Sequence, residues 1–137
     1  MTANPSEIGY IADIEQATLD NPHFRQVLFT GTQLQLTVMT IPPGGEVGLE
    51  MHDGLDQFIR IEEGMAKVTM GRTKDQLDEV HEVEDDWVAI IPGGTWHNVE
   101  NTGEGPLKLY SLYSPPEHPD GTVHETKADS DADEHDH

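Results

Sequence analysis

The sequence GGEVGLEMHDGLDQFIRIEEG, residues 44–64, holds three potential metal ligands between two short apolar runs. These are Glu50, His52 and Gln57. Glu50 and His52 are two residues apart, so in a β-strand their side chains point to the same face. Gln57 follows an Asp-Gly pair, which is typical of the turn that joins two antiparallel strands. The stretch therefore predicts a hairpin that brings oxygen and nitrogen donors close together.

A second stretch, DWVAIIPGGTWHNVEN at residues 86–101, carries His97 close to its end. Its first half has the continuous apolar character of a buried strand, and a Gly-Gly pair then indicates a turn before a short strand. Imidazole, carboxylate and amide donors without sulfur suit divalent Mn, Fe, Co, Ni, Zn or Cu. With the three residues above, His97 would leave such an ion a net charge of about +1 and open positions for water or substrate oxygens.

The rest of the chain consists of short apolar runs, each bounded by Gly, Pro or Asp. No segment keeps a helical period, so the sequence predicts an all-β sandwich or barrel. Residues 11–15 are expected to form a short strand or one helical turn. Strands are expected at residues 24–30, 33–41, 47–52, 56–62, 65–70, 79–83, 87–92, 96–100 and 107–114.

A chain of 137 residues is expected to form one domain, since this length can bury a sufficient core. Residues 1–116 are assigned to the barrel and its N-terminal strands, and residues 117–137 to a polar, acidic tail. From about Thr126 onward the tail has too little apolar area to offset the entropy of ordering, so we expect disorder there. The His residues of the tail are too loosely spaced for a specific metal site.

The charge balance is extreme, with 27 Asp and Glu against 7 Lys and Arg and a net charge of −20. Such a chain repels nucleic acids and anionic membranes, so neither is expected as a partner. Two interpretations remain open: an ordinary soluble protein with an acidic tail, or adaptation to high salt, which screens repulsion within an acidic surface. The chain lacks Cys, a signal peptide and an apolar run of the roughly 18 residues needed to span a bilayer, so we expect a cytoplasmic protein without disulfides.

The first stretch resembles the first of two characteristic motifs of the cupin superfamily. That motif reads G, five residues, H-x-H, three or four residues, E, six residues, G. This chain has Gly44, then Glu50 and His52, then Gln57 and Gly64 at the same spacing. Glu50 thus stands where the family has its first His, and Gln57 stands where it has an acidic ligand.

The second stretch resembles the second cupin motif, which reads G, five residues, P-x-G, two residues, H, three residues, N. The matching residues are Asp86, Pro92, Gly94, His97 and Asn101. Asp86 replaces a glycine, which is tolerable because Asp accepts turn conformations. Every spacing agrees in both motifs. The resemblance implies a double-stranded β-helix, the cupin or jelly-roll barrel, with a divalent metal ion in its mouth.

Taken singly, each of the four candidate ligands could equally have a structural role. The resemblance favours a metal site, because the carboxylate has only moved from one ligand position to another and four donors remain: Glu50, His52, Gln57 and His97. It implies a small metal-dependent enzyme that acts on an oxygen-rich small molecule, as an isomerase, an epimerase or a dioxygenase. The altered ligands leave the reaction open. The alternative is a non-catalytic cupin that binds a metal or small ligand as a sensor or store.

Tyr113 is the candidate catalytic residue. In a strand over residues 107–114 it shares the more apolar face, so it can reach the cavity and donate a hydrogen bond to a bound oxygen. The alternative is a buried Tyr bonded to the backbone. A homodimer is also expected, because the resemblance suggests one and because residues 27–30 hold no charge that would protect a sheet edge. We expect its interface in a segment before Gln33.

Overall fold

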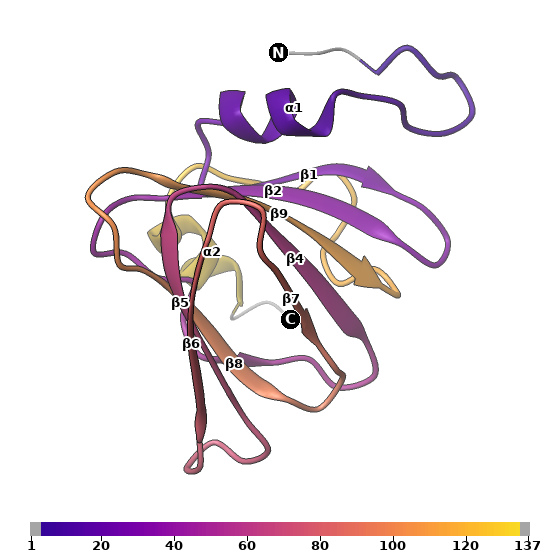
Figure 1. The fold of residues 1–137 in the computed structure, drawn as a ribbon. Helices are drawn as coiled ribbons and strands as arrows, with labels where there is room; N and C mark the ends of the chain where they lie inside the picture. The colour runs from indigo at the N-terminus through magenta and orange to yellow at the C-terminus, as the bar shows by residue number, and fades with distance from the viewer. Residues whose placement is uncertain (1–3, 135–137) are drawn as a thin grey trace.

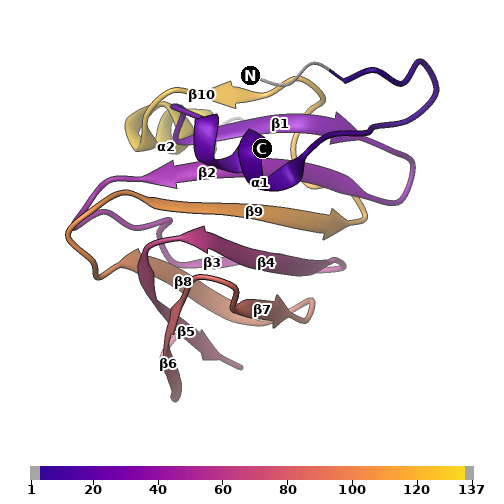
Figure 2. The ribbon, with the colours of Figure 1, turned by 45° about the horizontal axis from the view of Figure 1, so that its top comes forward.

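The computed structural model describes residues 4–134. The strands lie in two antiparallel sheets that face each other (Figures 1 and 2). One sheet has the order β10-β1-β2-β9-β4-β7 and the other the order β3-β8-β5-β6, which confirms the predicted all-β double-stranded β-helix. In chain order the elements are α1 (Ile14–Asp20), β1 (Arg25–Thr30), β2 (Gln35–Ile41), β3 (Glu50–Met51), β4 (Asp56–Glu63), β5 (Met65–Gly71), β6 (Glu79–Glu84), β7 (Val88–Ile91), β8 (Trp96–Asn101), β9 (Leu107–Ser114), β10 (Val123–His124) and α2 (Lys127–Glu134).

The core lies between the two sheets. Alternating residues of each strand face it, as the period-two pattern predicts, so Gln57, Ile59 and Ile61 of β4 are buried together. Burial of these apolar side chains contributes roughly 1.5–3 kcal/mol each to folding. The buried apolar residues that meet in the core are Phe24, Met39, Ile41, Ile59, Ile61, Ala66, Val68, Val83, Ile91, Val99, Leu107 and Leu109.

The strand expected at residues 47–52 is reduced to the two residues of β3. The predicted hairpin across the Asp53-Gly54 turn is wrong, because β3 pairs with β8 and lies in a different sheet from β4. Gly48 has a φ of 105°, a conformation open to glycine but not to a strand residue. Its N–H donates to the side chain of Asn98 at 2.9 Å instead of to a neighbouring strand. The side-chain hydrogen bond therefore replaces the ladder just before the candidate ligands begin.

The turn at Asp86 agrees with expectation. Its φ of 74° lies in the left-handed region, where Asp is tolerated better than most residues. The backbone N–H of Asp86 donates to the carbonyl of Ile61 at 2.9 Å, and its carboxylate accepts from Arg60 at 2.9 Å. Asp thus fills a position that the family reserves for glycine.

Helix α1 replaces the strand or single turn expected at residues 11–15. It begins after Asp13, whose side chain accepts a hydrogen bond from the backbone N–H of Gln16 at 3.1 Å. It ends before Pro22, which cannot continue a helix. The helix packs against β2, β4 and β9 on the side of the sheet away from the core (Figure 1).

The expectation of disorder from Thr126 onward is wrong for residues 127–134, which form α2. The backbone N–H of Thr126 donates to the Asp129 carboxylate at 3.3 Å, and the backbone N–H of Asp129 donates to the Thr126 hydroxyl at 3.2 Å. This reciprocal pair is a capping box, which starts a helix. Ser130 of α2 is buried against the barrel. Residues 135–137 lie outside the described part of the chain.

The expected open edge at residues 27–30 is partly closed by the chain itself. β10 pairs with the first half of β1, Arg25 opposite His124 and Gln26 opposite Val123. A homodimer through a segment before Gln33 stays a prediction. Between residues 4 and 134, we find no helix with both the length and the apolar character to cross a membrane.

Candidate metal centre

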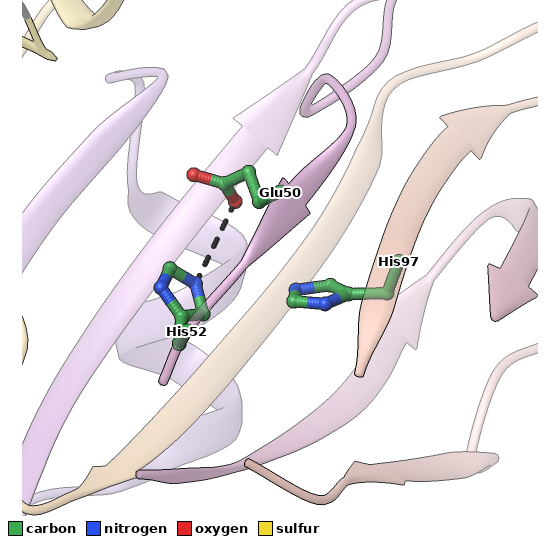
Figure 3. Close-up of side chains that lie close together, drawn as sticks. All are labelled: Glu50, His52 and His97. Carbon is green, nitrogen blue, oxygen red and sulfur yellow. Dashed lines mark ion pairs between the residues drawn. The ribbon is translucent and has the colours of Figure 1, made fainter. Parts of the chain in front are cut away.

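Glu50, His52 and His97 come together where β3 meets β8. The pairing of these strands sets Glu50 directly opposite His97, and His52 lies two residues beyond Glu50 on the same side (Figure 3). One side-chain donor atom from each residue lies within 4.8 Å of the others, so the three could hold a metal ion. The Glu50 Oε1 and His52 Nε2 atoms are 3.9 Å apart. The shared face that the i and i+2 spacing predicts is therefore present.

Gln57 reaches the same place from β4. It lines a small cavity of about 10 Å³ together with Glu50 and His97. Its amide nitrogen donates to the hydroxyls of Ser111 at 3.3 Å and Tyr113 at 3.2 Å. These two bonds fix the orientation of the amide, and its buried Oε1 atom has no hydrogen-bond partner.

Three imidazole nitrogens are also buried without a hydrogen-bond partner; one is Nε2 of His118, and the other two belong to candidate ligands. The Nε2 atoms of His52 and His97 are both buried without a hydrogen-bond partner. Buried polar atoms are nearly always satisfied, and an unsatisfied one costs about 1–3 kcal/mol. The imidazoles of His52 and His97 lie with the Glu50 carboxylate in one cluster, and Gln57 Oε1 is a third unpartnered donor on a residue that lines the same small cavity as Glu50 and His97, so the donor set fits a metal ion.

In both His52 and His97, the Nδ1 atom faces an oxygen acceptor, which leaves the lone pair of Nε2 directed into the site. The Nδ1 atom of His97 lies 3.0 Å from the carbonyl of Thr95, to which it donates as the protonated nitrogen. The Nδ1 atom of His52 lies 3.4 Å from the carboxylate of Glu117. In both rings Nε2 is then the unprotonated nitrogen, the form in which imidazole binds metals.

The two imidazoles differ in basicity. Burial lowers the pKa of His97, which keeps it neutral. Burial also lowers the pKa of His52, but the hydrogen bond to Glu117 and the charges of Glu50 and Glu117 outweigh it, so the pKa of His52 is raised. A proton therefore competes with a metal ion at His52 more strongly than at His97.

Tyr113 lies in the floor of the site, as its strand position predicts. It is 1% exposed, and burial raises the pKa of its hydroxyl to about 12. Its ring touches His52 edge-on, with the ring centres 5.8 Å apart. The neutral hydroxyl accepts from Gln57, so the structure gives Tyr113 a positioning contact with a candidate ligand rather than with the backbone.

A larger pocket of about 300 Å³ opens beside two of the candidate ligands, Glu50 and His52. Sequence analysis missed two charged residues in its wall, Arg25 of β1 and Glu117 after β9. Arg25 had a detectable signal, since it shares the buried face of its strand with the apolar Val27. Two other basic residues on the barrel strands do not line this pocket: Arg60 pairs with Asp86, and Lys108 donates to the carbonyl of Asn21.

The segment after β9 supplies further lining residues. His118 is buried edge-on against Tyr113, with ring centres 5.2 Å apart, and His124 is buried in β10. Burial, aided by the nearby charge of Arg25, lowers the pKa of His118 to about 3. The tail His residues at these two positions are therefore parts of the pocket wall rather than solvated side chains.

Comparison with known proteins also points to the cupin family. A family model described as a cupin domain matches residues 37–113, more than half of the chain. This chain is a cupin. The match contains both quoted stretches, so the resemblance seen in residues 44–64 and 86–101 is confirmed.

Three relatives show how far the similarity of this cupin extends. It is 52% identical over 121 residues to the uncharacterized protein YrkC of Bacillus subtilis, a match that covers 88% of this chain and 65% of YrkC. It is 36% identical over 124 residues to the uncharacterized protein L612 of Acanthamoeba polyphaga mimivirus, covering 90% of this chain and 75% of L612. The crystal structure of BH2720 from Bacillus halodurans has a TM-score of 0.91 at 51% identity, covering 96% of this cupin and 99% of that chain.

Proposed function

We propose that this cupin binds one divalent metal ion and acts at that ion on a small, oxygen-rich molecule, as an isomerase, an epimerase or a dioxygenase. The observation that carries the proposal is the cluster of three buried donor atoms without partners around one carboxylate. A metal ion would satisfy all three donors at once. The proposed ligands are Glu50, His52, Gln57 and His97.

The chemistry of the donors supports the ion class. Two imidazoles, a carboxylate and an amide suit Mn, Fe, Co, Ni, Zn or Cu rather than a soft ion that prefers thiolates. When bound, such an ion supplies a Lewis acid that polarises a carbonyl or similar oxygen. The neighbouring pocket of about 300 Å³ has the size of a small-molecule site.

Residues around the ligands hold them in place. Thr95 and Glu117 keep the protons of His97 and His52 on their Nδ1 atoms. Tyr113 fixes the Gln57 amide. Such partners tune a metal site, and their loss typically lowers metal affinity about 10–100-fold.

The alternative function is non-catalytic binding of a metal or small ligand, and one observation favours it. The pKa of Tyr113 is about 12 and that of His118 about 3, so neither group exchanges a proton readily near neutral pH. Efficient general acids and bases have pKa values near the working pH. Turnover of polyols, sugars and 2-oxo acids by the metal-loaded cupin, abolished by chelator, would separate an enzyme from a sensor or store.

Metal analysis of the cupin as isolated, followed by competitive chelator titration, tests the ion site directly. We expect one ion per chain and an affinity that falls at least tenfold in His97→Ala, since this change deletes one donor. His81→Ala is the matched control, because His81 lies exposed on β6 with Glu79 at 3.1 Å, away from the site. Equal affinities in the parent and both variants would overturn the proposed ligand set.

A further inference from the structure

Arg25 marks a second binding feature next to the candidate metal centre. It lines the pocket of about 300 Å³ that is also lined by Glu50 and His52. Arg25 is the one Arg or Lys among the described residues that form this wall. A molecule bound in the pocket would therefore face the metal ligands on one side and a guanidinium on another.

Among residues 4–134, the charge of Arg25 has no acidic partner. The side chain is 3% exposed, and no ion pair joins it to any residue between positions 4 and 134. Its Nη1 atom donates to the hydroxyl of Ser130 at 2.6 Å and lies 3.4 Å from Nδ1 of His124. Its Nε atom is buried without a hydrogen-bond partner.

Arg25 differs from the other Arg and Lys residues because it is the one that is buried among the described residues. Arg60, Lys67 and Lys127 each lie within 3.1 Å of a carboxylate. The chain offers 27 acidic residues, so acids are abundant. A buried charge without a counter-charge is costly, by several kcal/mol, unless something else supplies that counter-charge.

From this arrangement we propose that the pocket takes a small organic acid whose carboxylate binds Arg25 while its oxygen donors at the other end reach the metal centre. The inference rests on the proposed metal function and names its substrate class. A guanidinium matches the planar, two-oxygen geometry of a carboxylate. A singly charged carboxylate also meets less repulsion from Glu50 and Glu117 in the same wall than a doubly charged phosphate would.

Two pairs of probe molecules test the carboxylate without any mutation. Malate and 2-hydroxybutanoate share a 2-hydroxy acid head and differ in a distal carboxylate or methyl group. The pair 2-hydroxyglutarate and 2-hydroxypentanoate is one carbon longer. We expect calorimetric titration of the metal-loaded cupin to show at least tenfold tighter binding of the dicarboxylate in one pair or both. Equal affinities within both pairs would overturn the proposal.

Two variants then separate the charge of Arg25 from its structural contacts. Arg25→Gln removes the charge, and we expect it to abolish the preference for the dicarboxylate while metal content stays that of the parent. Ser130→Ala removes the 2.6 Å bond but keeps the charge, and we expect it to retain the preference within about twofold. Preserved preference in Arg25→Gln would overturn the assignment.

The readouts keep the two proposals apart. Metal content measured on the same samples reports on the ligand set alone. A cupin that holds no ion but still prefers dicarboxylates in an Arg25-dependent manner would refute the metal function and leave the carboxylate site standing. If Arg25→Gln fails to fold, the comparison of paired probes on the parent still decides the outcome.

Discussion

Gln57 shows how an amide can occupy a position where the family has a carboxylate. Ser111 and Tyr113 accept hydrogen bonds from its nitrogen, so its oxygen stays directed away from them. Both partners are hydroxyls, which can turn and donate instead of accept. The site therefore has the means to hold either an amide or a carboxylate at this position.

Gln57→Glu should bind metal more tightly and turn over more slowly. A second carboxylate attracts the ion, and about 1.4 kcal/mol suffices for a tenfold gain in affinity. The lower net charge of the ion also weakens its polarisation of a bound oxygen. Competitive chelator titration measures the first effect. Gln33→Glu, at an exposed position, controls for the added charge. An unchanged metal affinity in both Gln57→Glu and His97→Ala would exclude Gln57 and His97 as ligands.

At the level of single residues, the sequence predicts the candidate ligands well and their neighbours poorly. The spacing of Glu50 and His52 determines a shared face, and the register of β3 with β8 adds His97. The strand pattern places Arg25 on a buried face, but no local pattern connects Arg25 or Glu117 to the site. Arg25 reaches the pocket through pairing of β1 with β10, and Glu117 through the path of the chain after β9.

Among the elements, α2 is the one that departs most from the sequence-based expectation. Alternating apolar residues identify the strands, whereas residues 127–134 contain hardly any apolar side chains. The residues of the capping box, Thr126 and Asp129, can be recognised in the sequence. The contact between Ser130 and Arg25 cannot, because it joins residues far apart in the chain. A helix that packs through polar contacts such as this one shows no periodic pattern of apolar residues in the sequence.

Truncation after Glu125 should therefore destabilise the fold. It leaves Nη1 of Arg25 without the Ser130 hydroxyl, and an unsatisfied buried donor costs about 1–3 kcal/mol, more when charged. We expect the melting temperature to fall by about 5 °C or more. Lys127→Ala is the control, because it removes only an exposed ion pair with Asp131 and should change the melting temperature little. A truncated form that melts like the parent would show that α2 does not stabilise the barrel.

Charge dominates the behaviour of the whole molecule. The chain has a net charge of −20 and only 7 Lys and Arg residues to neutralise its carboxylates. Like charges therefore repel across much of the surface. Short-range screening is largely complete by about 0.2 M salt. The two interpretations of the acidic surface therefore differ above that concentration.

If the acidic surface is adapted to high salt, the melting temperature of the full chain should rise steadily with KCl up to about 1 M. Calorimetric scans from low to molar KCl provide the measurement, and the truncated form gives the comparison for the acidic tail. A plateau above about 0.2 M would instead indicate an ordinary acidic protein.

The pairing of Glu50 with His97 joins two segments that are distant in the chain, through a strand of only two residues at the edge of a sheet. Closing so long a loop costs chain entropy, and two residues of ladder return little of it. An ion held by both segments would act as a reversible cross-link in the polymer sense. The barrel would then gain one more restraint from solution after folding, at a two-residue strand on the edge of its sheet.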